Sequence, residues 1–176
     1  MGCHGPRMTG ATPQGGARRN DEATLEVDAR FRPRMVPEVI PPETEIIATK
    51  VLDAAFRVHR ALGAGFKESV YQRCLAHALC LDGVRISQST PLRVEFEGLV
   101  IDDAGQPDFV VEDLIVVELK ASDGFHAIQA AQVINYLKAS GLSLGLLINF
   151  NVPLLRDGIR RYIHPDLVRA RIHRSE

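Results

Sequence analysis

The chain has 176 residues, which is enough for one domain with a hydrophobic core and too few for two full domains. Its 21 basic and 22 acidic residues nearly cancel, so no overall positive field would draw it to nucleic acid or to an anionic membrane, and any such contact must be local. No apolar run approaches the roughly 18 residues that a transmembrane helix needs. We therefore expect a soluble protein without a membrane partner.

The three cysteines, Cys3, Cys74 and Cys80, are odd in number and lack the paired spacing of zinc sites and disulfide scaffolds. Free thiols of this kind fit a reducing cytoplasm, which is the location we expect.

The N-terminal segment differs in composition from the rest of the chain. Residues 1–43 carry clusters of Gly and Pro and few large apolar side chains, a composition that buries too little surface to offset the entropy of ordering. We expect a disordered tail over residues 1–43, one folded domain over residues 44–165 and a C-terminal tail over residues 166–176.

Two helices are predicted at the start of the domain. Thr44 is a candidate N-cap, and apolar side chains then recur at helical spacing until Leu62, just before Gly63. A second helix is predicted from about Lys67 to Leu81, where an Asp-Gly pair closes it.

The period of the apolar residues changes to two beyond Val84. A half-exposed antiparallel strand pair is predicted around Gly98, which offers the turn between residues 92–97 and 99–101. Two further strands follow over residues 108–111 and 114–120, and the second is apolar on both faces, as a central strand would be.

Helical spacing returns over residues 125–139, with Gly141 as the C-cap, and a buried strand is predicted over residues 144–150. A strand, a crossover helix and another apolar strand imply a parallel pair. A short Arg-rich helix is predicted over residues 153–162. This order of elements predicts an α/β fold with a mixed central sheet flanked by helices.

The segment from Pro107 to Lys120 carries the clearest chemical pattern. Alternate side chains of a strand share a face, so Glu118 and Lys120 project to the same side. If Asp108 lies on the neighbouring strand, its carboxylate can reach the same point and complete an oxygen-rich site for a hard divalent cation. Taken alone, Glu-x-Lys is also the pattern of an ordinary ion pair on a strand.

Metal-assisted phosphodiester hydrolysis is one reaction that this set of residues suits. A divalent metal activates water and neutralises charge on the transition state. Because Mg²⁺ keeps several waters, Asp108, Glu118 and the backbone carbonyl of Leu119 would suffice as protein ligands. Glu68 could add a fourth ligand, or could only favour the positive end of its helix. Lys120 would orient or deprotonate the attacking water, or stabilise developing negative charge.

A family resemblance adds to this reading. The stretch from Gly65 through Glu68 to Tyr71 resembles the G-x-x-E-x-x-Y signature of a small-protein family assigned to the PD-(D/E)-x-K nuclease superfamily, and the likeness continues over most of residues 45–163. It implies a restriction-endonuclease-like αβββαβ core, with the nuclease motif carried by Pro107-Asp108 and Glu118-Leu119-Lys120.

The predicted third helix also carries part of this resemblance. Gln132 and Tyr136 look like the Q-x-x-x-Y element of an exonuclease-like branch, and they share a helix face from which they could contact a phosphate backbone or brace Lys120. The chain departs from the family at residues 129–132, where Gln-Ala-Ala-Gln replaces His-Glu-Ala-Gln. Buried rings with satisfied hydroxyls are the plain alternative for Tyr71 and Tyr136.

Three functional hypotheses follow. The first is a Mg²⁺- or Mn²⁺-dependent nuclease acting on DNA, with a homodimer that spans a duplex as one assembly open to a domain of this size. The second is a non-cutting nucleic-acid-binding or assembly module that keeps the nuclease fold, which the near-neutral charge and the changed Gln129-Ala130 positions favour. The third is a structural protein in which Glu118 and Lys120 form an ion pair.

Overall fold

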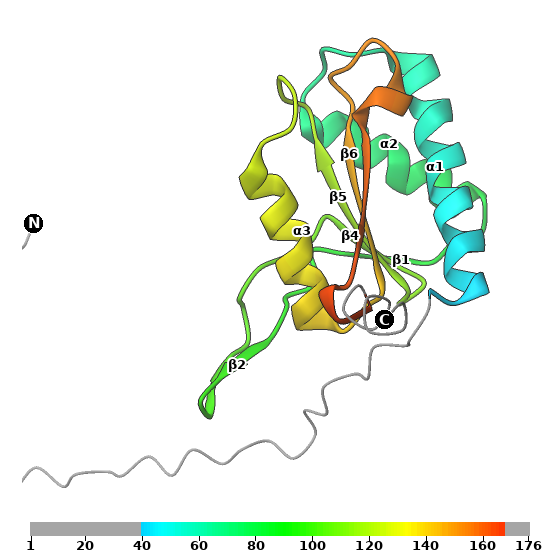
Figure 1. Ribbon diagram of the computed structural model, residues 1–176. Coiled ribbons are helices and arrows are strands. Elements are labelled where there is room, and N and C mark those ends of the chain that lie inside the picture. Colours follow the sequence, from blue (N-terminus) through cyan, green and yellow to red (C-terminus); the bar gives the residue numbers. More distant parts are fainter. Residues whose placement is uncertain (1–39, 168–176) are drawn as a thin grey trace, which may run out of the picture.

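A mixed five-stranded sheet separates two helices from a third (Figure 1). The structure is a computed structural model that describes residues 40–167. The tails expected over residues 1–43 and 166–176 lie almost entirely outside this range. The elements are, in chain order, α1 (Pro42–Leu62), α2 (Glu68–Leu81), β1 (Ile86–Gln88), β2 (Val94–Phe96), β3 (Leu99–Ile101), β4 (Phe109–Val111), β5 (Ile115–Lys120), α3 (Ala127–Ser140), β6 (Leu144–Asn149), the 3₁₀ helix η1 (Leu155–Gly158) and β7 (Ile159–Ile163).

The strand order of the main sheet is β1-β4-β5-β6-β7. Strands β5 and β6 run parallel and are joined through α3, whereas the other neighbouring pairs are antiparallel. Strand β5 is the middle strand, and its side chains are buried up to Lys120. The predicted α/β class, the mixed sheet and the central place of the Glu-x-Lys strand are therefore confirmed.

Each face of the sheet packs against a different helix layer. Val117 and Leu119 of β5 join the core cluster that contains the apolar faces of α1 and α2, and Val116 joins the cluster under α3. Helix α3 lies very close to β6 at Gly145, where an added Cβ atom would come within 2.5 Å of a Val133 methyl. A side chain at this position would push the helix away from the sheet.

Two local predictions were wrong. Helix α1 begins at Pro42 rather than after a Thr44 cap, because proline at the first helical position lacks only an N–H that would have no partner inside the helix. The segment predicted as an Arg-rich helix over residues 153–162 forms η1 and then strand β7. Strand β7 satisfies the free backbone edge of β6, and its Ile and Tyr side chains suit a strand.

The predicted half-exposed strand pair is present as β2 and β3, but it lies outside the main sheet. Its turn places Glu97 and Gly98 at positive φ, 49° and 84°, as a two-residue hairpin turn of type I′ requires. The resulting β2–β3 ribbon extends away from the body of the domain (Figure 1).

No helix within residues 40–167 combines the length and the apolar character that crossing a bilayer requires.

Candidate active site

Asp108 and Glu118 face each other where β4 begins and β5 ends. Phe109 pairs with Val117, so the antiparallel register brings the preceding residue, Asp108, opposite Glu118. The Asp108 Oδ2 atom accepts a hydrogen bond of 2.7 Å from the Leu119 N–H. Asp108 is thus held against the strand that carries the Glu-x-Lys pattern.

Pro107 leaves the backbone carbonyl of Leu119 without an N–H donor from the opposite residue. The N–H and C=O groups of a strand residue point to the same neighbouring strand. Because the Leu119 N–H reaches Asp108, its carbonyl also faces this end of β4. The register brings Pro107 opposite Leu119, and proline has no N–H to donate to that carbonyl.

Glu118 is buried, with 4% of its surface exposed. Its two carboxylate oxygens differ in their hydrogen bonding. Oε1 accepts a hydrogen bond of 2.7 Å from the Lys120 ammonium. Oε2 is buried and has no hydrogen-bond partner within the described part of the chain. A buried carboxylate oxygen without a partner is costly, and a bound cation is one way to satisfy it.

Helix α2 adds two polar side chains to the site from its first turns. Glu68 and Gln72 are four residues apart and share a helix face. Gln72 Nε2 donates a hydrogen bond of 3.1 Å to Asp108 Oδ1, so both oxygens of Asp108 are held. The Glu68 carboxylate lies close enough to raise the pKa of Lys120.

Burial and mutual charge alter the titration of all three motif residues. Burial raises the pKa of Asp108, and it raises the pKa of Glu118 together with the nearby negative charge of Asp108. Burial alone would lower the pKa of Lys120, but the hydrogen bond to Glu118 and the charges of Glu118, Glu68 and Asp108 outweigh it and raise that pKa. Lys120 therefore remains an ammonium, while the two acids resist becoming charged together.

A divalent ion suits this donor set only if it keeps much of its water shell. Within residues 40–167, no group of three or more His, Cys, Asp and Glu side chains could hold a metal ion by itself. The available donors are two opposed carboxylates and the Leu119 carbonyl. Such a set matches Mg²⁺, which binds proteins through one or two carboxylates and retains several waters. The unpartnered Glu118 Oε2 supports the fit.

Tyr71 serves the site indirectly. Its ring is fully buried and stacks on Phe150 with 4.5 Å between the ring centroids. Its hydroxyl donates to the Gly63 carbonyl at 2.7 Å and accepts from the Phe66 N–H at 3.2 Å. These contacts fix the turn between α1 and α2, and with it the start of α2 that carries Glu68 and Gln72.

Gln132 and Tyr136 interact with each other on α3. Gln132 Nε2 donates to the Tyr136 hydroxyl at 2.7 Å, and that hydroxyl lies 3.4 Å from the Gln106 carbonyl. Tyr136 also lies against Gly105. The pair therefore supports the segment that leads into Pro107-Asp108. Among the described contacts, no hydrogen bond joins it to Asp108, Glu118 or Lys120.

Two polar residues near the site were not found by sequence reasoning. Gln72 could have been noticed only from its spacing to Glu68. Asn149 could have been noticed as a polar residue in an apolar strand, and it pairs with Lys120 in the register of β5 and β6. It is fully buried, and its side chain hydrogen-bonds backbone atoms of Ser122, Gly124 and Asn151. Asn149 thus shapes the loop that follows Lys120.

Comparison with known proteins agrees with this geometry. A family model described as the PD-(D/E)XK nuclease superfamily matches residues 45–162, which include every motif residue above. No curated protein and no solved structure matches the chain. Membership of the superfamily suggests nuclease activity, with nucleic acid as the substrate and a divalent metal as the usual cofactor. The chain belongs to the PD-(D/E)XK nuclease superfamily.

Proposed function

We propose that this protein is a Mg²⁺- or Mn²⁺-dependent nuclease that hydrolyses phosphodiester bonds in DNA. The observation that carries the proposal is the buried, unpartnered Oε2 of Glu118, which lies beside Lys120 and opposite Asp108. We place the protein in the G-x-x-E-x-x-Y branch of the superfamily on the basis of Gly65, Glu68 and Tyr71. We also propose a folded domain over residues 44–165 and a location in the cytoplasm.

Each residue of the site has a proposed role. Asp108, Glu118 and the Leu119 carbonyl would hold the metal, with Glu68 as a further ligand, directly or through water. When bound, the metal would lower the pKa of a bound water and neutralise phosphate oxygens. Lys120 would stabilise negative charge on the phosphate, because its neighbouring acids keep it protonated. Gln132 and Tyr136 would contact the substrate or hold the segment before Asp108.

A cleavage assay tests the proposal. The purified protein is incubated with single-stranded, duplex, flapped and branched DNA and with RNA, in Mn²⁺ and in EDTA. We expect metal-dependent cleavage of DNA that Asp108→Ala abolishes. Lys120→Ala should reduce it by about 100-fold or more, the range typical of a lost catalytic proton-transfer or charge-stabilising group.

Matched controls come from the exposed face of α1, where Asp53→Ala and Lys50→Ala remove the same charges far from the site. Both control variants should cleave like the wild type. If every DNA and RNA substrate survives in Mn²⁺, the nuclease proposal is wrong.

A second candidate is a nucleic-acid-binding or assembly module that has lost catalysis. The 2.7 Å contact between Lys120 and Glu118 favours it, because this ion pair occupies one oxygen of the motif acid. Gln129, one of the positions that differ from the family, is also used structurally, since its side chain accepts from the His126 N–H and donates to Ser122. Salt-dependent DNA binding that Asp108→Ala leaves unchanged, without metal binding, would support this candidate.

A further inference from the structure

The β2–β3 ribbon carries an apolar face that the proposed nuclease chemistry does not use. Val94 pairs with Ile101 and Phe96 pairs with Leu99, so these four side chains lie on one face of the ribbon. Phe96 is 67% exposed, Leu99 52% and Ile101 44%. Contiguous exposed apolar side chains of this kind mark interaction surfaces.

This face continues into a groove beside helix α3. The groove has a volume of about 480 Å³, and its walls include Leu92 and Val94 at the base of the ribbon and Ala131 and Tyr136 on α3. Ile128, which is 75% exposed, lies at the same groove. The ribbon face and the groove together offer one apolar surface, which we call the ribbon surface.

The ribbon has little support of its own. Its strands are three residues long and pair only with each other, and Figure 1 shows that the ribbon extends away from the main sheet. A two-stranded hairpin is marginally stable in water unless something packs against it. An occupant of the ribbon surface would therefore stabilise the ribbon as well as bury its apolar side chains.

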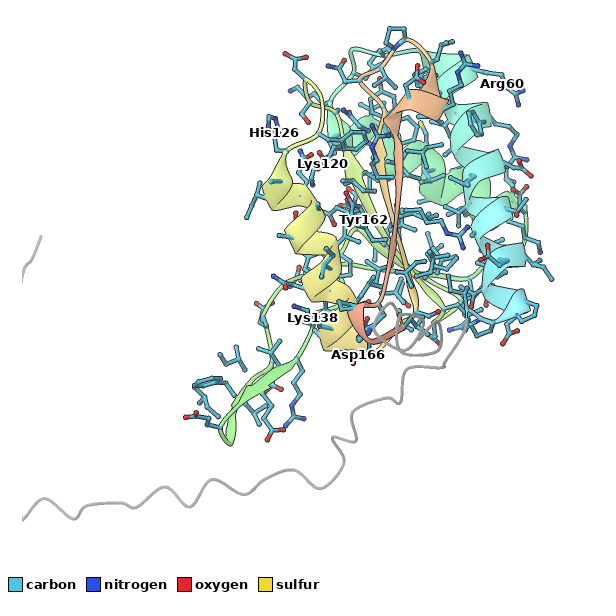
Figure 2. The ribbon with its side chains drawn as sticks, viewed as in Figure 1. Arg60, Lys120, His126, Lys138, Tyr162 and Asp166 are labelled. Atoms are coloured by element: carbon cyan, nitrogen blue, oxygen red, sulfur yellow. The ribbon has the colours of Figure 1, made fainter. Side chains whose placement is uncertain are left out.

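The charges around the ribbon surface indicate which occupant fits. The turn at the tip of the ribbon carries the exposed acid Glu97, whereas exposed Glu95 lies in the middle of β2. Lys138 lies on the part of α3 nearer the ribbon (Figure 2), and it lines a second cleft together with Arg93, Val94 and Glu95. The acidic tip disfavours nucleic acid, whose phosphates it would repel. The negative charge of Glu97 at the tip of one copy does, however, complement the positive charge of Lys138 in another copy.

We propose that two copies of this chain associate through their ribbon surfaces about a two-fold axis. The apolar face of each ribbon lies against the ribbon and groove of the other copy, and Glu97 of each copy lies near Lys138 of the second copy. A two-fold contact uses the same patch on both copies, so that Glu97 of each copy meets Lys138 of the other. The contact does not require catalysis and leaves Asp108, Glu118 and Lys120 outside the ribbon surface, which shares Tyr136 with the proposed site.

Analytical ultracentrifugation over a concentration series tests the apolar part of the contact. Wild type should show a monomer–dimer equilibrium, and Phe96→Ser with Leu99→Ser should raise the dimer dissociation constant by about 100-fold or more, since each lost side chain occurs twice in the contact. Leu81→Ser is the matched control, because Leu81 is also an exposed apolar residue but lies at the end of α2. It should leave the dissociation constant unchanged.

A charge exchange tests the two-fold pairing. Glu97→Lys and Lys138→Glu should each weaken the dimer, because each places like charges together, and the double variant should restore it. Thermal unfolding of each variant shows that the domain remains folded. A wild type that stays monomeric, or a dimer insensitive to Phe96→Ser with Leu99→Ser, would overturn the proposal and leave the surface to a different protein. A double variant as weak as the single ones would overturn the pairing of Glu97 with Lys138.

Discussion

The carboxylate of Glu118 is buried in the protein before any ligand binds, and that of Asp108 is half-buried. Asp108 is held by a backbone N–H and an amide side chain, and Glu118 by Lys120 and by the backbone of Asp108. This arrangement orients both acids but does not neutralise them. Ionising these two acids in the folded protein without a ligand costs free energy. Acids of this kind are expected at positions where the function of the site, and not the stability of the fold, requires a carboxylate.

In the metal-free protein, the ionised Asp108 carboxylate should lower the free energy of unfolding. Burial raises the pKa of Asp108 more than the Leu119 N–H and the Lys120 charge lower it. The folded state therefore binds this proton more tightly than the unfolded chain, and the free energy of unfolding falls as the pH rises through the folded pKa. Asn at this position removes the charge, and its amide can still accept from Leu119 and donate to a reoriented Gln72.

We therefore expect Asp108→Asn to be more stable than wild type in EDTA at mildly alkaline pH. The difference should shrink as the pH falls toward about 4, the ordinary pKa of Asp. Urea unfolding across this pH range measures it, and Asp53→Asn at the exposed face of α1 is the control. A variant that is less stable than wild type at every pH contradicts the account.

Gln72 should act on the metal through Asp108. Removing its amide with Gln72→Ala leaves Asp108 Oδ1 without a donor, so the carboxylate is less well oriented. We expect Mn²⁺ affinity to fall by about 10- to 100-fold, as for other residues that orient a metal ligand. Calorimetry measures the affinity, with Arg73→Ala on the exposed side of the same helix as the control. Equal affinity in Gln72→Ala and wild type would show that Gln72 has no positioning role.

At the scale of elements, α2 and α3 hold opposite sides of the site. Tyr71 anchors α2 through its hydroxyl and its stacked ring, and α3 packs against β6 at Gly145. The Tyr136 contact with Gly105 and Gln106 extends this support to the segment before Asp108. The geometry of the site thus depends on where α2 and α3 pack, and not only on the pairing of the strands.

The Tyr71 hydroxyl should contribute measurably to stability. Tyr71→Phe keeps the ring stacked on Phe150 but removes both hydrogen bonds across the α1–α2 turn. We expect a loss of about 1–2 kcal/mol in the free energy of unfolding. Tyr71→Ala should lose about 3–5 kcal/mol because it also leaves a cavity. Chemical denaturation separates the two, and a Tyr71→Phe protein as stable as wild type would remove the hydroxyl from this role.

The close approach of α3 to β6 can be tested by a double-mutant cycle. Gly145→Ala should cost about 1–3 kcal/mol, because the added methyl meets Val133. In a Val133→Ala background the same substitution should cost less, since the obstructing methyl is gone. Urea denaturation of the four proteins measures the coupling, and a strictly additive result would contradict the proposed contact.

At the scale of the whole molecule, local patterns were enough to predict most of the fold. The strands β4, β5 and β6 are apolar runs separated by strong turn or helix signals, so their order and the parallel pair could be predicted. Asp108 and Glu118 could be placed together because they lie on one hairpin, only ten residues apart in a register that a short turn determines.

Features that depend on distant contacts could not be predicted. Strand β7 contains consecutive arginines, and its extended form depends on pairing with β6. The Gln72 contact with Asp108 joins residues 36 apart, and no local pattern indicates it. The β2–β3 ribbon lies outside the main sheet because β1, and not the ribbon, pairs with the free edge of β4. This choice of partner is also a distant contact.

Calorimetric titration of the metal-free protein with Mn²⁺ tests the central claim, that Asp108 and Glu118 form a metal site. Wild type should bind Mn²⁺ at neutral pH, and Asp108→Asn and Glu118→Gln should each reduce the affinity by more than about 100-fold, beyond the loss typical of residues that only orient a ligand. Asp53→Asn should bind like wild type. A wild type that binds no Mn²⁺, or that binds it equally well with Gln at position 118, would contradict the account.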